Sequence, residues 1–205
     1  MFKAAIDTNA LIEALGSLKA LRRKWNVRYP HVALALDRGY LRLYLLAHVQ
    51  AEFEHIHKPQ SELRQLLEEL IERGTIVCLS ETPCCSTESL RKCYEKDVKP
   101  YIIKAHDRDE VILSEFFGLV DKSLTTPLPL SEKVFVFITN NVKHYGTNVA
   151  SATTNCISQM LRELDLEGQY TPQIGIYDIN WLETRLKMIM KRFSNGLQTG
   201  KGNAL

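Results

Sequence analysis

The chain has 205 residues, of which 45% are hydrophobic and 24% are charged, a composition typical of one soluble globular domain. This composition excludes disorder over most of the length, and a chain of this size buries enough surface to fold without disulfides. The 26 basic and 24 acidic side chains give a net charge of +2, so any surface for a polyanion must be local.

The cysteines and the apolar stretches bear on the cellular compartment. The five cysteines are odd in number and irregular in spacing, and the N-terminal residues lack the layout of a secretion signal, so we expect a reducing compartment and a cytoplasmic protein. The longest apolar stretches, 43–49 and 134–138, are far shorter than the roughly 20 residues that span a bilayer. We therefore expect no membrane association.

The pattern of apolar residues predicts strands that alternate with helices. The predicted strands are 2–6, 40–47, 75–79, 133–139 and 173–178. The predicted helices begin with one that follows residues 7–9 and continue with 30–37, 48–57, 61–73, 87–96, 109–119, 149–164 and 181–193. This alternation predicts a three-layer α/β/α sandwich with a mainly parallel sheet, formed by residues 1–193, and a flexible tail at 194–205.

Polar residues that follow strands are the first candidates for a site, because the crevice of an open parallel sheet lies beyond the carboxyl ends of its strands. Asp7 ends the first strand, and Glu52 lies on the helix after the second. Asp109 and Glu110 open the helix before the strongest strand, which ends in Thr139-Asn140-Asn141. Carboxylates that converge repel one another unless a hard divalent cation, Mg²⁺ or Mn²⁺, neutralises them. Such a cluster predicts phosphodiester hydrolysis.

Each of these acids, taken alone, also has a purely structural explanation. Asp7 suits a helix N-cap, Asp109 and Glu110 suit the positive end of a helix dipole, and Glu52 suits a solvated surface. Taken together, the order of these acids along the chain favours a metal-binding site over the separate structural explanations.

Several segments resemble motifs of the PIN-domain nuclease family. AAIDTNALIEAL resembles the opening strand and turn, AHVQAEFEHI the helix that bears the glutamate, HDRDEVILSEF the acidic helix start, and VFVFITNNVKHYG the strand that ends in Thr-x-Asp. IGIYDINWLETRL is similar to the closing strand and helix, so the resemblance extends from Phe2 to about Phe193. It implies a metal-dependent endoribonuclease that uses Mg²⁺ or Mn²⁺ and cuts RNA.

The resemblance assigns Asp7, Glu52 and Asp109 as the catalytic, metal-binding acids. Glu54 is the second choice for Glu52, and Glu110 is a further ligand, with Asp107 as an alternative to it.

Three uncharged residues support these acids in the family. Asn9 braces Asp7, and Thr139 matches the threonine after the fourth strand. Asn141 stands where the family usually has a fourth aspartate, and its amide is a weaker, neutral ligand. The alternative interpretation is therefore a PIN-like scaffold that has lost catalysis and binds RNA or a protein.

Basic and aromatic side chains are the candidates for holding RNA. Phosphates would be bound with little sequence preference by Arg22, Arg23, Lys104, Arg108, Lys143 and His144. Arg22 and Arg23 equally suit the solvated end of a helix. Tyr145 and Trp25 are candidates for stacking on bases. The sequence leaves open a homodimer and an inhibitory or assembly protein partner.

The spacing of cysteine and histidine argues against zinc. Adjacent Cys84 and Cys85 do not fit a zinc knuckle, and His55 and His57 point to different faces of a helix; Cys93 and His106 complete the set of candidate ligands.

Overall fold

The computed structural model describes residues 1–81, 84–102, 107–127, 129, 132–166 and 173–199, with the backbone alone at 107, 142–144 and 193–199. Within these residues, five strands form one parallel sheet in the order β3-β2-β1-β4-β5. The strands are β1 (Phe2–Ile6), β2 (Leu41–Leu45), β3 (Ile76–Cys78), β4 (Val136–Ile138) and β5 (Gly175–Tyr177). The prediction of a parallel α/β sheet is confirmed.

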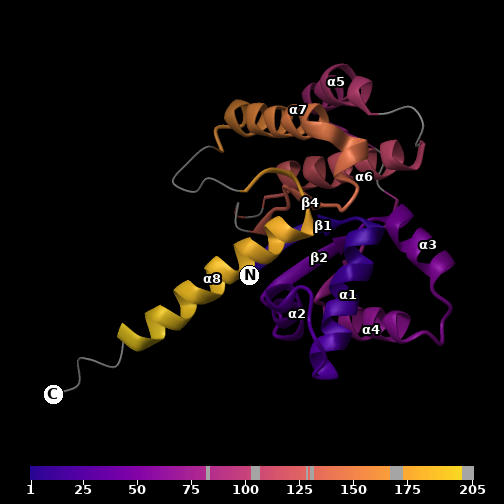
Figure 1. Cartoon of the computed structure of the whole chain (residues 1–205). Coiled ribbons are helices and arrows are strands. Elements are labelled where there is room, and N and C mark those ends of the chain that lie inside the picture. The colour runs from indigo at the N-terminus through magenta and orange to yellow at the C-terminus, as the bar shows by residue number, and fades with distance from the viewer. Residues whose placement is uncertain (82–83, 103–106, 128, 130–131, 167–172, 200–205) are drawn as a thin grey trace.

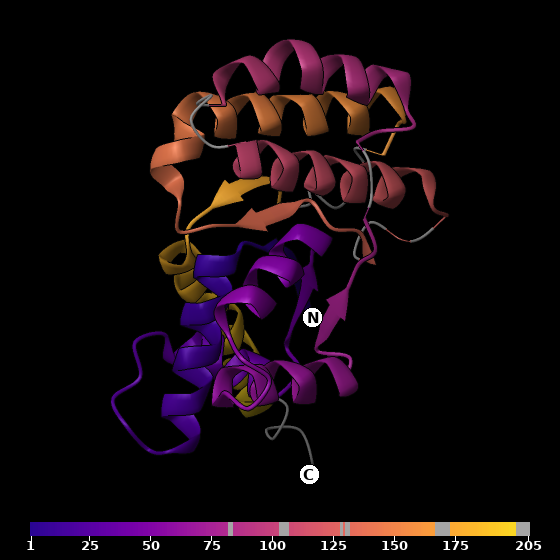
Figure 2. The same ribbon diagram turned by 90° about the vertical axis from the view of Figure 1, so that its right-hand side faces the viewer.

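Helices cover both faces of this sheet, which makes three layers (Figure 1). The helices are α1 (Thr8–Arg22), α2 (Pro30–Asp37), α3 (Ala47–Ile56), α4 (Glu62–Glu72), α5 (Glu88–Cys93), α6 (Asp107–Thr125), α7 (Val142–Glu163) and α8 (Ile179–Thr199). A π-helix, η1 (Tyr94–Val98), and a 3₁₀-helix, η2 (Lys99–Tyr101), follow α5. Figure 2 shows α5, α6 and α7 stacked above the sheet, with α1, α4 and α8 on its other side.

The central strand of the sheet is buried because its last three residues are apolar. Ala4, Ala5 and Ile6 of β1 have no exposed surface, and β1 pairs with β2 on one side and with β4 on the other. A strand that is covered on both faces needs this continuous apolar composition. β2 and β3 extend the sheet on one side of β1, whereas β4 and β5 extend it on the other side. The strand order therefore reverses between β1 and β4, and at such a reversal point a parallel sheet opens a crevice.

Local signals fix the ends of several helices. Ser61 caps α4 by accepting a hydrogen bond from the Arg64 amide at 3.3 Å, and Gly74 follows the helix with a φ of +67° that glycine adopts without strain. α7 starts at Val142, seven residues before the predicted start, and is interrupted at Gly146, where φ is +60°. α8 extends to Thr199, beyond the predicted start of the tail.

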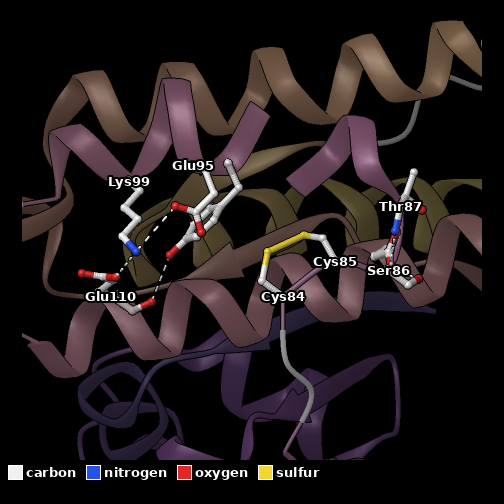
Figure 3. Close-up of a disulfide and its surroundings, with 9 residues drawn as sticks. Cys84, Cys85, Ser86, Thr87, Glu95, Lys99 and Glu110 are labelled. Atoms are coloured by element: carbon white, nitrogen blue, oxygen red, sulfur yellow. Dashed lines mark hydrogen bonds and ion pairs between the residues drawn. A yellow bond between two sulfur atoms is a disulfide. The ribbon is translucent and has the colours of Figure 1, made fainter. Parts of the chain in front are cut away.

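The cysteines form pairs that the sequence did not predict. Cys93 of α5 is bonded to Cys156 of α7, and Cys84 is bonded to Cys85 (Figure 3). Cys78 of β3 is a free thiol.

No helix in the described part of the chain combines the length and the apolar character that are needed to cross a membrane.

Candidate metal centre

Asp7 is the first residue of the centre and lies directly beyond β1. Its Oδ1 accepts a hydrogen bond from the Thr8 amide at 2.7 Å, and its Oδ2 accepts one from the Thr139 hydroxyl at 2.8 Å. It is the N-cap of α1 and is 4% exposed. Because Thr139 follows β4, these bonds join the ends of two neighbouring strands at the reversal point of the sheet.

Glu52 of α3 faces the same point. Its Oε2 accepts a hydrogen bond from the Thr8 hydroxyl at 2.6 Å, so Thr8 lies between the carboxylates of Asp7 and Glu52. Glu54 points elsewhere, because its carboxylate pairs with Arg64 at 3.0 Å. The structure thus places Glu52, and not Glu54, beside Asp7.

Asp109 reaches the centre from the start of α6. It is 8% exposed, and its Oδ1 accepts a hydrogen bond from the side-chain amide of Asn141 at 3.5 Å. The backbone amide of Asn141 donates to the Thr139 hydroxyl at 2.9 Å. The hydroxyl of Tyr145 donates to the backbone carbonyl of Asp109 at 3.4 Å. Asn141 therefore connects Asp109 to Thr139, and Thr139 connects to Asp7.

The centre carries excess negative charge. Burial raises the pKa of Asp7 above its ordinary value, and the charges of Asp109 and Glu52 raise it further, while the hydrogen bonds from Thr139 and Thr8 act in the opposite direction. Burial is also the main reason why the pKa of Tyr145 is raised, and the carboxylates of Asp7 and Asp109 add to it. Ionised carboxylates at this depth are unfavourable unless positive charge accompanies them.

The donor chemistry fits a hard divalent cation. Three carboxylates offer oxygen ligands, which Mg²⁺ and Mn²⁺ prefer. A cation would offset the burial and, to a smaller extent, the repulsion that raise the pKa of Asp7. In the described part of the chain, three ligand atoms within 4.8 Å of one another occur only at Cys93, Asp97 and Cys156, so the carboxylates are spaced more widely. Water ligands would complete the coordination, as is usual for Mg²⁺.

Glu110 does not face Asp7, although the sequence placed it among the ligands. Its carboxylate pairs with Lys99 at 3.0 Å, on the side of α6 that faces η1 (Figure 3). Consecutive helical residues point in directions about 100° apart, so Asp109 and Glu110 do not share one face. The side chain of Asp107 lies outside the described residues. Asn9 is exposed on the first turn of α1.

Two of the predicted RNA-binding residues lie far from the centre. Arg22 and Arg23 are at the opposite end of α1 from Asp7, and fourteen helical steps from Thr8 to Arg22 span about 21 Å. Arg22 pairs with Glu69 and Asp37, and Arg23 with Glu62. These ion pairs correspond to the solvated helix end that the sequence also allowed.

Other basic residues lie beside the centre or outside the described part of the chain. Arg108 has a side chain that is 85% exposed, and its guanidinium lies 3.9 Å from a Glu52 carboxylate oxygen. The backbone of Lys143 and His144 forms the first turn of α7, directly after Asn141, and their side chains are not described. Lys104 lies outside the described residues.

Tyr145 cannot stack on a base, because it is buried. It is 1% exposed and packs edge-to-face on Phe137, with 5.9 Å between ring centroids. Trp25 is exposed, but it lies after α1 and contacts Arg23. Neither aromatic residue is placed to hold a base at the acidic centre.

The sequence did not reveal the pocket beside Glu52. This pocket has a volume of about 280 Å³ and is lined by His48, Ala51, Glu52, His55, Arg108 and Ile112. The His48 ring nitrogen lies 2.8 Å from the buried carboxylate of Glu115, which orients the imidazole. The signal for this pocket in the sequence was the helical spacing of His48, Ala51, Glu52 and His55. Residues at i, i+3, i+4 and i+7 share one face of a helix.

Comparison with family models, with curated proteins and with solved structures finds no match for this chain. The fold and the centre define an α/β protein with an all-parallel sheet and three carboxylates at its point of reversal.

Proposed function

We propose that the chain is a metal-dependent endoribonuclease of the PIN-domain type. The observation that supports this proposal is the meeting of Asp7, Glu52 and Asp109, from three distant segments, at the reversal point of the sheet. Two buried carboxylates beside a third that is partly exposed are unfavourable without a positive charge, whereas a cation-binding centre needs such a group of carboxylates. RNA enters the proposal through the family resemblance. A cytoplasmic location enters it separately, through the odd number and irregular spacing of the cysteines.

In this proposal, some residues of the chain bind the metal ion and others hold its ligands in place. Asp7, Glu52 and Asp109 would hold Mg²⁺ or Mn²⁺, and Thr8 and Thr139 fix the carboxylates of Glu52 and Asp7 through hydrogen bonds. When bound, the cation supplies an activated water and neutralises charge on the phosphate. Hydrolysis in line would leave a 5′-phosphate and a 3′-hydroxyl.

Arg108 and the neighbouring pocket would position the substrate. The guanidinium of Arg108 is exposed beside Glu52, where it can bind a phosphate next to the scissile one. The pocket that Glu52 lines together with other residues of α3 is large enough to receive part of a nucleotide.

The test is cleavage of fluorescent single-stranded RNA, with DNA of the same sequence in parallel, in Mn²⁺ and in EDTA. We expect cleavage by the wild type in Mn²⁺ and a loss of at least about a hundredfold in Asp7→Asn, because a charged metal ligand contributes several kcal/mol to the transition state. Glu110→Gln is the matched control, since Glu110 pairs with Lys99, and it should cut within about twofold of the wild type.

A second candidate function rests on Asn141. The amide of Asn141 lies beside Asp109 at the position of the family's fourth acid, so the centre has one negative charge fewer. If the folded wild type binds RNA in Mn²⁺ and in Mg²⁺ but does not cut it, the chain is a binding module and the nuclease proposal is wrong. Equal cleavage by the wild type and by Asp7→Asn would also contradict it.

A further inference from the structure

A second group of ligand atoms lies in the helical layer formed by α5, η1 and α7. The Sγ atoms of Cys93 and Cys156 and a carboxylate oxygen of Asp97 all lie within 4.8 Å of one another. The Cys93 Sγ lies 3.6 Å from Asp97 Oδ2. Cys156 is buried, Cys93 is half-buried and Asp97 is exposed, so the group extends from the core to the surface.

The local structure brings these residues together. Cys93 ends α5, and Asp97 follows four residues later on the π-helix η1, an element that often occurs at functional positions. Cys156 faces both from α7, which packs against α5 and η1. The three residues line one cavity of about 430 Å³, whose other lining residues are Tyr101, Asn148, Ser151, Ala152, Asn155 and Gln159. Solvent and small ligands therefore have access to the group.

We propose that Cys93, Asp97 and Cys156 form a Zn²⁺ site when the disulfide between the two cysteines is reduced. Two thiolates and one carboxylate are ligands that Zn²⁺ accepts, and the cavity provides room for water as the fourth ligand. Thiolates are soft ligands and do not select Mg²⁺ or Mn²⁺, so this site differs in metal preference from the acidic centre.

The disulfide and the zinc ion exclude each other, because both use the same two sulfur atoms. Two molecules of a low-molecular-weight thiol reduce the disulfide by exchange: they supply two electrons and two protons, and leave as their own disulfide. The binding of Zn²⁺ then displaces the two thiol protons to solvent. Thiol redox conditions therefore decide whether the site is open to metal.

The sequence argued against zinc from the adjacency of Cys84 and Cys85 and from the spacing of His55 and His57, and it did not consider Cys156. Cys156 lies 63 residues after Cys93 along the chain, so the two cysteines meet only through the packing of α5 on α7.

The test is a Co²⁺ titration of the full chain after reduction with a phosphine and removal of the reductant under argon. Thiolate ligands to Co²⁺ give intense charge-transfer and visible bands that carboxylate sites lack, so the acidic centre does not interfere. We expect one equivalent of Co²⁺ to develop these bands and Zn²⁺ to displace it, with neither effect in the oxidised protein.

Variants assign the ligands. Cys93→Ser should abolish the charge-transfer band, and Asp97→Asn should weaken Co²⁺ binding by about tenfold or more, since even indirect partners of a metal contribute that much. Cys78→Ser and the double variant Cys84→Ser/Cys85→Ser are the matched controls and should bind as the wild type does. Far-UV circular dichroism checks that each variant is folded.

Several results would overturn the proposal. These are the absence of thiolate bands in the reduced wild type, bands that persist in Cys93→Ser, and bands that vanish in the Cys84→Ser/Cys85→Ser control. Native mass spectrometry gives an independent count, with one zinc expected on the reduced chain and none on the oxidised chain. Because no cleavage is measured, the outcome does not depend on the nuclease proposal.

Discussion

The observed role of Asp7 and its proposed role have conflicting requirements. As the N-cap of α1 it needs only an oxygen acceptor, which asparagine also provides, but as the proposed cation ligand it would need a buried negative charge. Burial raises its pKa, and Asp109 and Glu52 add to the shift, so the ionised carboxylate destabilises the fold when no metal is bound. If Asp7 is a metal ligand, its burial therefore lowers the stability of the metal-free chain.

This conflict predicts that Asp7→Asn increases stability in EDTA at pH 7, although the same change should remove the proposed cleavage activity. A carboxyl whose pKa is raised on folding lowers the free energy of unfolding as the pH rises through its folded-state pKa. The pH dependence of stability of the wild type and of Asp7→Asn should therefore be alike below about pH 4, and the two stabilities should diverge above it. Urea unfolding between pH 3 and pH 7 measures this. A variant that is less stable than the wild type at pH 7 would show that the negative charge is compensated.

Asn141 is the residue at which the charge of the centre can be increased. In Asn141→Asp a carboxylate would replace the amide that donates to Asp109, so we expect Mn²⁺ to bind about tenfold more tightly, or about 1.4 kcal/mol. The metal-free variant should be less stable than the wild type, because two carboxylates then meet without a proton between them. Calorimetric Mn²⁺ titration decides, and unchanged affinity would place Asn141 outside the coordination sphere.

At the scale of residues, the sequence predicted the positions that topology determines and failed where side-chain direction decides. Asp7 and Thr139 could be predicted, because both directly follow strands. The direction of Glu110 depends on Lys99, which belongs to another helix, and the burial of Tyr145 depends on Phe137. These are tertiary contacts that no local pattern contains.

At the scale of elements, apolar period and turn residues predicted all strands of the described sheet. They predicted 133–139 as a strand, whereas β4 includes only Val136–Ile138, because ladder bonds require a paired neighbour and not just apolar composition. The early start of α7 was missed because Gly146 interrupts the apolar period, although the helix resumes after it.

Asp121 of α6 holds the segment that leads into α5. Its carboxylate accepts hydrogen bonds from the amide and the hydroxyl of Ser86, at 2.7 and 2.6 Å, and from the amide of Thr87, at 3.3 Å. Burial alone would raise the pKa of Asp121, but these bonds outweigh it and lower the pKa below its ordinary value.

We therefore predict that Asp121→Asn lowers the free energy of unfolding at pH 7 by about 2 kcal/mol, the typical contribution of hydrogen bonds to a charged acceptor. A carboxyl with a lowered pKa stabilises the fold above its ordinary pKa and loses that effect as the pH falls through the folded-state value. The difference from the wild type should thus shrink below about pH 4. Urea unfolding at pH 7 and pH 3 tests this prediction, with Glu81→Gln at an exposed loop position as control. A difference that is independent of pH would refute the role of charge.

At the scale of the whole molecule, the acidic centre and the cysteine group depend on different parts of the fold. The acidic centre depends mainly on β1 and β4, with contributions from α3 and α6, whereas the cysteine group depends on the packing of α5 and η1 on α7. A change from the disulfide to the proposed zinc-bound form of the cysteine group should therefore leave the acidic centre at the strand ends in place.

The disulfide between Cys93 and Cys156 constrains the relative placement of α5 and α7. It closes a loop between residues 63 positions apart, and the chain-entropy relation gives a stabilisation of about 4 kcal/mol for a loop of that length. We expect the oxidised protein to be more stable in urea than the reduced one by up to this amount. Cys93→Ser should match the reduced wild type and should not respond to reductant, whereas Cys78→Ser should behave as the wild type does in both states. If Zn²⁺ restores stability to the reduced wild type but not to Cys93→Ser, the two chemistries share one site; if reduction leaves the stability unchanged, the helical layer is held by its apolar contacts alone.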